Sequence, residues 1–202
     1  MRIALKDHEY INLLQGIKER ITSARVAASR HVNRELVALY WDIGAAIVEK
    51  QKTEGWGKSV VERLSVDIQK DFPGVTGFSP DNIWRMRQFY AEYSNLEFLE
   101  QAVPEIAKIA NLSFFSKVIS DKEITFLEQL VPEFVSPNWT SGLRQLLAQV
   151  PWGHNLLILK KASSIPERLY YILAAAAYGW SRNVLLNQIK AKSYERAMLE
   201  EK

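Results

Sequence analysis

The 202 residues are 48% apolar and 24% charged, with a formal net charge of +3, which excludes a disordered chain of low hydrophobicity. The absence of cysteine excludes disulfides, thiolate metal sites and a cysteine nucleophile. Charged residues at the N-terminus precede any apolar run, and the most apolar stretch, residues 170–180, is shorter than the roughly 20 residues of a membrane span. We therefore expect a cytoplasmic protein with no signal peptide and no membrane partner.

Charge is unevenly distributed along the chain. Residues 1–94 carry 14 basic and 12 acidic side chains, residues 95–138 carry 3 and 7, and residues 139–202 carry 9 and 4. We interpret these segments as an N-terminal helical module, an acidic helical insertion and a C-terminal helical module. The basic C-terminal segment permits binding to a polyanion, and ordinary solvated helix faces are the alternative explanation.

The N-terminal module begins with a long amphipathic helix from Tyr10. Its apolar residues keep the three-four spacing of a helical face at Leu13, Leu14, Ile17, Ile21, Ala24 and Ala28. The same period resumes over residues 36–48, and the mainly polar residues 31–35 lie between the two sets. We therefore expect two helices here, or one bent helix. A further helix over residues 57–71 must end near Pro73.

The next helix, over residues 80–94, has the clearest start signal in the sequence. Ser79 can cap its first free amides, Pro80 suits the first helical position, and Asp81 complements the helix dipole. Alternating apolar runs are almost absent, so we predict an all-α fold, with any strand confined to a small wing near residues 74–77.

The acidic insertion contains an internal repeat. Residues 98–106 return as residues 126–134, with seven identities in nine positions at an offset of 28. Two copies are too few for a solenoid. We interpret the repeat as a duplicated helical segment, with chance resemblance as the alternative.

The C-terminal module reads as a series of short helices. We expect one over residues 139–149, one opened by Pro151, one from Ile165 to Tyr178, and a last one over residues 182–192 capped by Ser181. The helical spacing also predicts a set of core residues: Tyr40, Trp41, Ile47, Trp152 and Leu156.

No arrangement of residues in the sequence indicates catalysis. The three histidines, His8, His31 and His154, are far apart and form no metal-ligand pair, and the sequence contains neither a glycine-rich phosphate loop nor a nucleophile elbow. The carboxylates are numerous, but helical periodicity places nearly all of them on solvated faces. We therefore predict no catalytic residue, no metal site and no cofactor.

Several blocks of the sequence, in the same order, resemble the N-terminal domain of the YhcG family and together cover about three quarters of the chain. They include Trp56-Gly57-Lys58-Ser59, Gly77-Phe78-Ser79-Pro80-Asp81-Asn82-Ile83, Pro151-Trp152-Gly153-His154-Asn155 and Gly179-Trp180-Ser181-Arg182-Asn183. Family members typically continue into a C-terminal PD-(D/E)xK nuclease domain. This sequence ends before such a domain, so we expect that the chain by itself is not an enzyme.

The sequence is compatible with two functions. In the first, the chain binds DNA through two helix-turn-helix-like modules, built on helices 80–94 and 182–192. The side chains assigned to DNA are Ser79, Arg85, Arg87, Gln88, Arg182, Asn183, Asn187 and Lys190. In the second, the chain is an interaction scaffold whose long N-terminal helix pairs with a copy of itself or with another protein and positions a nuclease domain or a partner.

Overall fold

The computed structural model describes residues 7–95, 98, 101, 102, 104 and 139–200. These residues form helices and loops and contain no strand, which confirms the all-α class. None of the described helices is both long and apolar enough to cross a membrane. The helices are α1 (Asp7–Glu54), α2 (Lys58–Asp71), α3 (Pro80–Tyr93), α7 (Trp139–Leu147), α8 (Trp152–Lys161), α9 (Ile165–Tyr178), α10 (Arg182–Lys190) and α11 (Ser193–Glu200).

The first helix is one continuous rod. It has 48 residues, which corresponds to a length of about 72 Å at 1.5 Å per residue. Of the two expected arrangements, two separate helices or a single one, the first was wrong, because residues 31–35 are helical. They contain neither proline nor glycine, and most of their side chains are exposed, so nothing in them interrupts the backbone hydrogen bonds.

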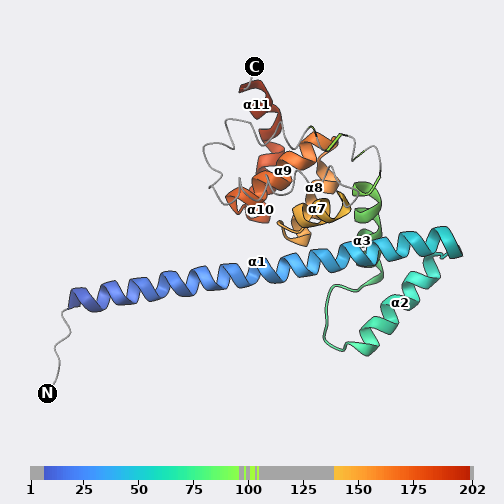
Figure 1. Ribbon diagram of the computed structural model, residues 1–202, viewed down its shortest axis with the longest axis horizontal. Coiled ribbons are helices and arrows are strands. Elements are labelled where there is room, and N and C mark those ends of the chain that lie inside the picture. The colour runs from blue at the N-terminus through green and yellow to red at the C-terminus, as the bar shows by residue number, and fades with distance from the viewer. Residues whose placement is uncertain (1–6, 96–97, 99–100, 103, 105–138, 201–202) are drawn as a thin grey trace.

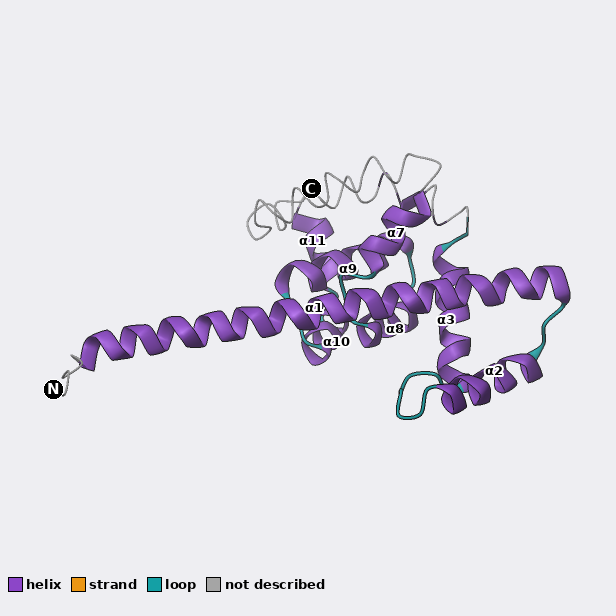
Figure 2. Cartoon of the chain, turned by 60° about the horizontal axis from the view of Figure 1, so that its bottom comes forward, coloured by secondary structure: helices purple, strands orange, loops and turns teal. Residues whose placement is uncertain are grey.

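Helix α3 crosses α1, and the remaining helices lie on two sides of this pair (Figures 1 and 2). Helix α2 lies on one side and α7 to α11 lie on the other (Figure 1). Between α1, α2 and α3 is a small apolar cluster of Tyr40, Ile47, Val61, Phe78, Ile83 and Met86. The N-terminal part of α1 extends beyond the rest of the described structure (Figure 1).

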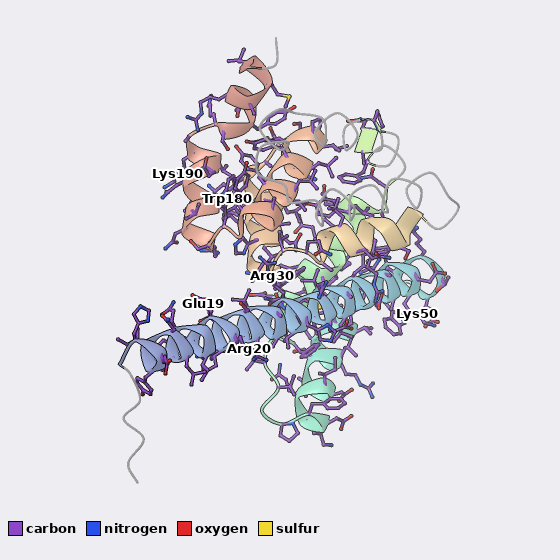
Figure 3. All side chains as sticks on the ribbon, turned by 60° about the vertical axis from the view of Figure 1, so that its left-hand side comes forward. Glu19, Arg20, Arg30, Lys50, Trp180 and Lys190 are labelled. Atoms are coloured by element: carbon purple, nitrogen blue, oxygen red, sulfur yellow. The ribbon has the colours of Figure 1, made fainter. Side chains whose placement is uncertain are left out.

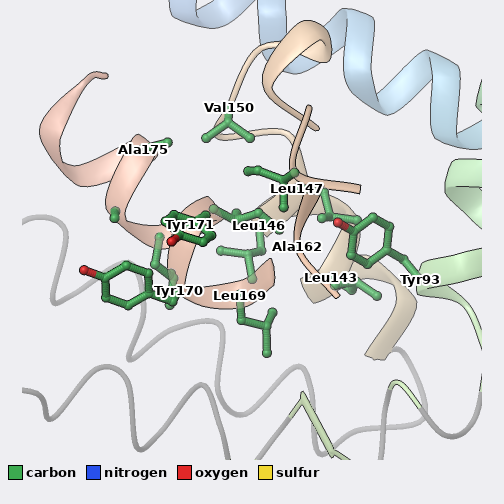
Figure 4. Close-up of a cluster of buried hydrophobic side chains, with 14 of the residues drawn as sticks. Tyr93, Leu143, Leu146, Leu147, Val150, Ala162, Leu169, Tyr170, Tyr171 and Ala175 are labelled. Carbon is green, nitrogen blue, oxygen red and sulfur yellow. The ribbon is translucent and has the colours of Figure 1, made fainter. Parts of the chain in front are cut away.

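A larger apolar core joins α1 and α3 to the C-terminal helices. Val37, Trp41, Phe89 and Tyr93 from the first two meet buried residues of α7 to α11 in this core. Figure 4 shows the leucines of α7 packed between Tyr93 and the tyrosines of α9. The residues drawn and labelled there include Leu143, Leu146, Leu147, Leu169, Tyr170 and Tyr171.

The predicted core residues divide into two groups. Tyr40, Trp41 and Ile47 are buried, as predicted. Trp152 and Leu156 are only half-buried. Trp152 nevertheless packs against both apolar clusters, so one side chain connects the two sides of the protein.

The segment expected to form a small β wing is an irregular loop. Residues 72–79 contain turns, bends and irregular backbone, with no strand. Two of its carbonyl groups accept hydrogen bonds from side chains of the flanking helices. Ser65 Oγ of α2 donates to the Phe78 carbonyl oxygen at 2.6 Å, and Asn82 Nδ2 of α3 donates to the Gly77 oxygen at 2.6 Å.

Two further expectations concern the last helix of the C-terminal module and the internal repeat of the acidic insertion. The last predicted helix, over residues 182–192, stops at Lys190, and α11 follows it as a separate helix. Lys192 between them has a left-handed backbone conformation, with φ of 53°. The internal repeat, apart from residues 98, 101, 102 and 104, lies outside the described residues.

Candidate nucleic-acid interface

Helices α9 and α10 follow each other closely, with three residues between them. Helix α9 ends at Gly179, whose φ of 60° gives the left-handed conformation that closes a helix without strain in glycine. Two residues later, Ser181 caps the N-terminus of α10, and its Oγ accepts a hydrogen bond from the Val184 amide at 3.3 Å. The three connecting residues therefore match the short, glycine-containing turn typical of a helix-turn-helix motif.

Contacts on both sides hold the turn in place. His154 Nε2 of α8 lies 2.8 Å from the Trp180 carbonyl oxygen, a distance that suits a hydrogen bond donated by the ring. The Trp180 ring stacks on Tyr178, with centroids 5.5 Å apart and 14° between the ring planes. Burial raises the pKa of the Tyr178 hydroxyl, so this ring remains neutral at physiological pH.

The exposed side of α10 is polar and basic. Asn183, Asn187 and Lys190 follow one another at intervals of four and three residues, so they lie on one helical face. All three are exposed, as is Arg182 at the start of the helix. Leu185 is fully buried and anchors the opposite face in the core.

An additional cation from α1, Arg30, lies beside this turn, and sequence reasoning missed it. A Cβ at Gly179 would lie 3.8 Å from Nη2 of Arg30. Figure 3 shows Lys190, Trp180 and Arg30 following one another from α10 to α1. Arg30 and Gly179 are distant in the sequence, so only the packing of α1 on the C-terminal helices brings them together.

The cations of this surface differ from those that tie helices together. Arg144 of α7 pairs with Asp42 of α1 at 2.5 Å, and Arg168 of α9 pairs with Glu92 of α3 at 3.2 Å. Among the described residues, no carboxylate lies within salt-bridge distance of Arg30, Arg182 or Lys190. Their charges are therefore directed to solvent. We refer to Arg30, Arg182, Asn183, Asn187 and Lys190 as the α10 surface.

The predicted site residues of α3 lie in a different packing unit. Helix α3 packs mainly on α1 and α2, whereas α10 packs on α8, α9 and α11. Ser79 caps α3, with its Oγ accepting from the Asn82 amide at 3.3 Å, as the sequence predicts. Arg85 and Gln88 are exposed, but Asp81 shares their face at helical spacing and brings a carboxylate to it.

Arg87 is engaged within the protein. Its Nε donates to Gln51 Oε1 of α1 at 2.6 Å, and its guanidinium lies 5.9 Å from the centroid of the Trp84 ring. The connection between α2 and α3 is also long, at residues 72–79. This connection is therefore longer than the usual helix-turn-helix turn, whereas the connection between α9 and α10 has the usual length.

The part of the chain that the structure describes contains no group of three or more histidine or carboxylate side chains placed to hold a metal ion.

A family model described as the DUF1016 N-terminal domain matches residues 16–141 and 114–196. The chain is 27% identical over 198 residues to a protein of Escherichia coli (strain K12) named "Putative nuclease YhcG". That alignment covers 94% of this chain and 47% of the relative, so the chain spans about half the length of the curated relative. No solved structure matches it.

Proposed function

The chain belongs to the DUF1016 N-terminal domain family, and on that premise we propose that it binds duplex DNA through the α10 surface. The observation that carries this proposal is the exposed polar face of α10, which follows a three-residue turn and bears cations without a carboxylate partner among the described residues. The name of the relative, a putative nuclease, supports nucleic acid as the ligand. Since the chain matches about half of that relative, we assign recognition to the shared half and cleavage to the remainder.

The side chains of α10 are chemically suited to a DNA groove. In a helix-turn-helix, residues near the N-terminus of the second helix contact base edges. Arg182 and Asn183 occupy that end of α10, and arginine and asparagine make bidentate hydrogen bonds to guanine and adenine. Lys190 lies at the other end, where an ammonium group neutralises a phosphate.

Arg30 extends the same surface onto α1. Its guanidinium lies beside Gly179 and therefore close to the start of α10. A phosphate that approaches the turn would meet this cation and Arg182 together. Two helices that are distant in the sequence would thus share the contacts that fix the orientation of the DNA.

The test is a measurement of DNA affinity over a range of salt concentrations. Replacing Arg30, Arg182 and Lys190 with alanine should weaken binding to a labelled duplex and lower the slope of log affinity against log salt by about one for each phosphate that is no longer neutralised. The control replaces Lys58, Arg63 and Lys70 of α2, which removes the same charge from another exposed surface. Equal affinity for the two triple variants would contradict the proposal. Branched and single-stranded DNA, measured in parallel, identify the preferred form.

A further inference from the structure

Residues 7–28 of α1, here called the N-terminal arm, carry an uncovered apolar surface. Six of its large apolar side chains are between 45% and 61% exposed, and five of them lie within residues 10–21: Tyr10, Ile11, Leu13, Ile17 and Ile21. Apolar residues exposed singly are ordinary on protein surfaces, but a contiguous group marks an interaction site. The arm extends away from the packed helices (Figure 1).

This surface lies on the side of α1 opposite the protein core. In the second half of α1, Val37 and Trp41 are buried and Gly44 lies against α3. Each of these has an apolar residue 27 positions before it, and those residues are Tyr10, Leu14 and Ile17. At 3.6 residues per turn, this interval is about 7.5 turns, which reverses the direction of a side chain. The core that α1 helps to build therefore leaves the arm uncovered.

The apolar residues of the arm follow the spacing of a coiled-coil seam. The intervals between them alternate between four and three residues through Tyr10, Leu14, Ile17, Ile21, Ala24 and Ala28. This seven-residue repeat forms a line of side chains into which a second helix can insert its own apolar residues. The next two positions of the repeat are His31 and Glu35, so the seam ends where α1 joins the body of the protein.

The positions that flank this seam are basic or apolar. Lys18, Arg20 and Arg25 lie directly beside it and are exposed, and the other flanking positions are Ile11, Leu13 and Ala27. Glu19 lies on the far side of the helix, where it accepts a hydrogen bond from Gln15 Nε2 at 2.8 Å. Within residues 10–28, therefore, no carboxylate lies beside the seam.

A second copy of the chain is a poor partner for this surface. In a parallel pair of arms, Arg20 of one copy would face Arg25 of the other. In an antiparallel pair, Lys18 would face Arg25. Flanking charges select coiled-coil partners, and like charges that face each other destabilise the pair. The complementary partner has acidic residues at its flanking positions.

We propose that the N-terminal arm docks a helix of another protein that combines an apolar seam with glutamate or aspartate on both flanks. This docking is independent of DNA binding, because it does not use the α10 surface. A polyanion such as DNA would require the cations but not the apolar seam, and a bilayer surface would make no use of a seven-residue repeat.

The probe is a designed helical peptide of about four heptads with Ile and Leu in its seam and glutamate at all flanking positions. The control peptide has lysine at the flanking positions and is otherwise identical. In fluorescence anisotropy titrations with the full chain, the glutamate peptide should bind at least about tenfold more tightly than the lysine peptide.

Variants of the arm separate the contributions of seam and charge. Replacing Ile17 and Ile21 together with Asp should abolish binding of the glutamate peptide. Lys18→Glu, Arg20→Glu and Arg25→Glu combined preserve the seam and should reverse the preference, so that the lysine peptide binds more tightly. Val66→Asp on α2, where Val66 is 64% exposed, is the matched control and should change nothing. Circular dichroism checks that all variants retain their helicity.

Several outcomes would overturn the proposal. Equal binding of the two peptides would show that flanking charge does not select the partner. Self-association of the wild-type chain in sedimentation experiments, abolished in the Ile17 and Ile21 variant, would assign the seam to a second copy. Binding of anionic vesicles or duplex DNA that depends on Ile17 and Ile21, with no binding of the glutamate peptide, would assign the arm to those ligands.

Discussion

Gly44 of α1 lies directly against Met86 of α3 where the two helices cross. A Cβ at position 44 would lie 2.9 Å from the Met86 carbonyl carbon and 2.9 Å from Tyr90 Cβ, both far below ordinary contact. The close approach of the two backbones therefore depends on the absence of a side chain at Gly44.

Gly44→Ala should lower the free energy of unfolding by about 1–3 kcal/mol or more, because an added methyl group meets backbone that cannot move aside easily. Gly16→Ala in the N-terminal arm is the control, since nothing lies within 4 Å of a Cβ at that position. That exchange should stabilise the helix by up to about 1 kcal/mol. Urea unfolding of both variants measures the difference, and equal stability of Gly44→Ala and wild type would show that the crossing relaxes.

Trp152 connects the two apolar clusters and is held by a hydrogen bond. Its ring lies 5.0 Å from Tyr40 and 5.1 Å from Phe89, centroid to centroid, and its Nε1 donates to Asn82 Oδ1 at 2.9 Å. Trp152→Ala should cost about 3–5 kcal/mol. Trp152→Phe keeps most of the packing but leaves the Asn82 oxygen without its donor, at a cost of about 1–3 kcal/mol.

The matched control for Trp152→Phe is Trp56→Phe. Trp56 Nε1 donates to Glu54 Oε2 at 2.9 Å, but this pair is exposed. Water replaces the missing donor there, so the midpoint of thermal unfolding should stay almost unchanged. A similar loss of stability in the two variants would show that the hydrogen bond of Trp152 stabilises the protein no more than the exposed hydrogen bond of Trp56.

Tyr93 predicts a specific weakness at high pH. Its hydroxyl is buried with no hydrogen-bond partner in the described structure, and burial raises its pKa well above the usual tyrosine range. Burial also raises the pKa of Tyr170 to about 12. The pKa of each hydroxyl is higher in the folded protein than the value of about 10 in the unfolded chain. The stability that comes from keeping the buried hydroxyl neutral is therefore complete below pH 10 and is lost as the pH rises through the folded-state pKa.

Tyr93→Phe should therefore unfold at a higher pH than wild type, and at pH 7 it should be at least as stable, because it removes an unpaired buried hydroxyl. Tyr10→Phe, at a position that is 52% exposed, should leave the alkaline transition unchanged. Circular dichroism between about pH 9 and 12 follows the transition. An identical midpoint for wild type and Tyr93→Phe would contradict the assignment of this weakness to Tyr93.

Arg85 and Arg87 are neighbours with different roles. Arg87→Ala removes a 2.6 Å hydrogen bond to Gln51 and the contact with Trp84, so it should lower the free energy of unfolding by about 1–2 kcal/mol. Arg85 is exposed, and Arg85→Ala should change stability by less than about 0.5 kcal/mol. Thermal unfolding distinguishes the two. If Arg85→Ala weakens DNA binding as much as the triple variant of the α10 surface, the binding site extends to α3.

Local signals in the sequence determined where α3 and α10 begin. Ser79 and Ser181 were identifiable as caps because each accepts a hydrogen bond from an amide three residues ahead, and such a bond needs no tertiary structure. The all-α class followed from helical periodicity for the same reason. The polar residues Asn183, Asn187 and Lys190 could be placed on one face by spacing alone.

Tertiary structure decided which of these faces are available. The sequence left open a break in the helix at residues 31–35. Such a break would change the direction of the apolar stripe before it relative to the stripe after it. Only a continuous helix makes the stripe of the arm point away from the core. Packing likewise brought Arg30 to Gly179 and the Arg87 guanidinium to Gln51. Contacts between residues far apart in the chain have no periodic signal, because they depend on how whole helices pack.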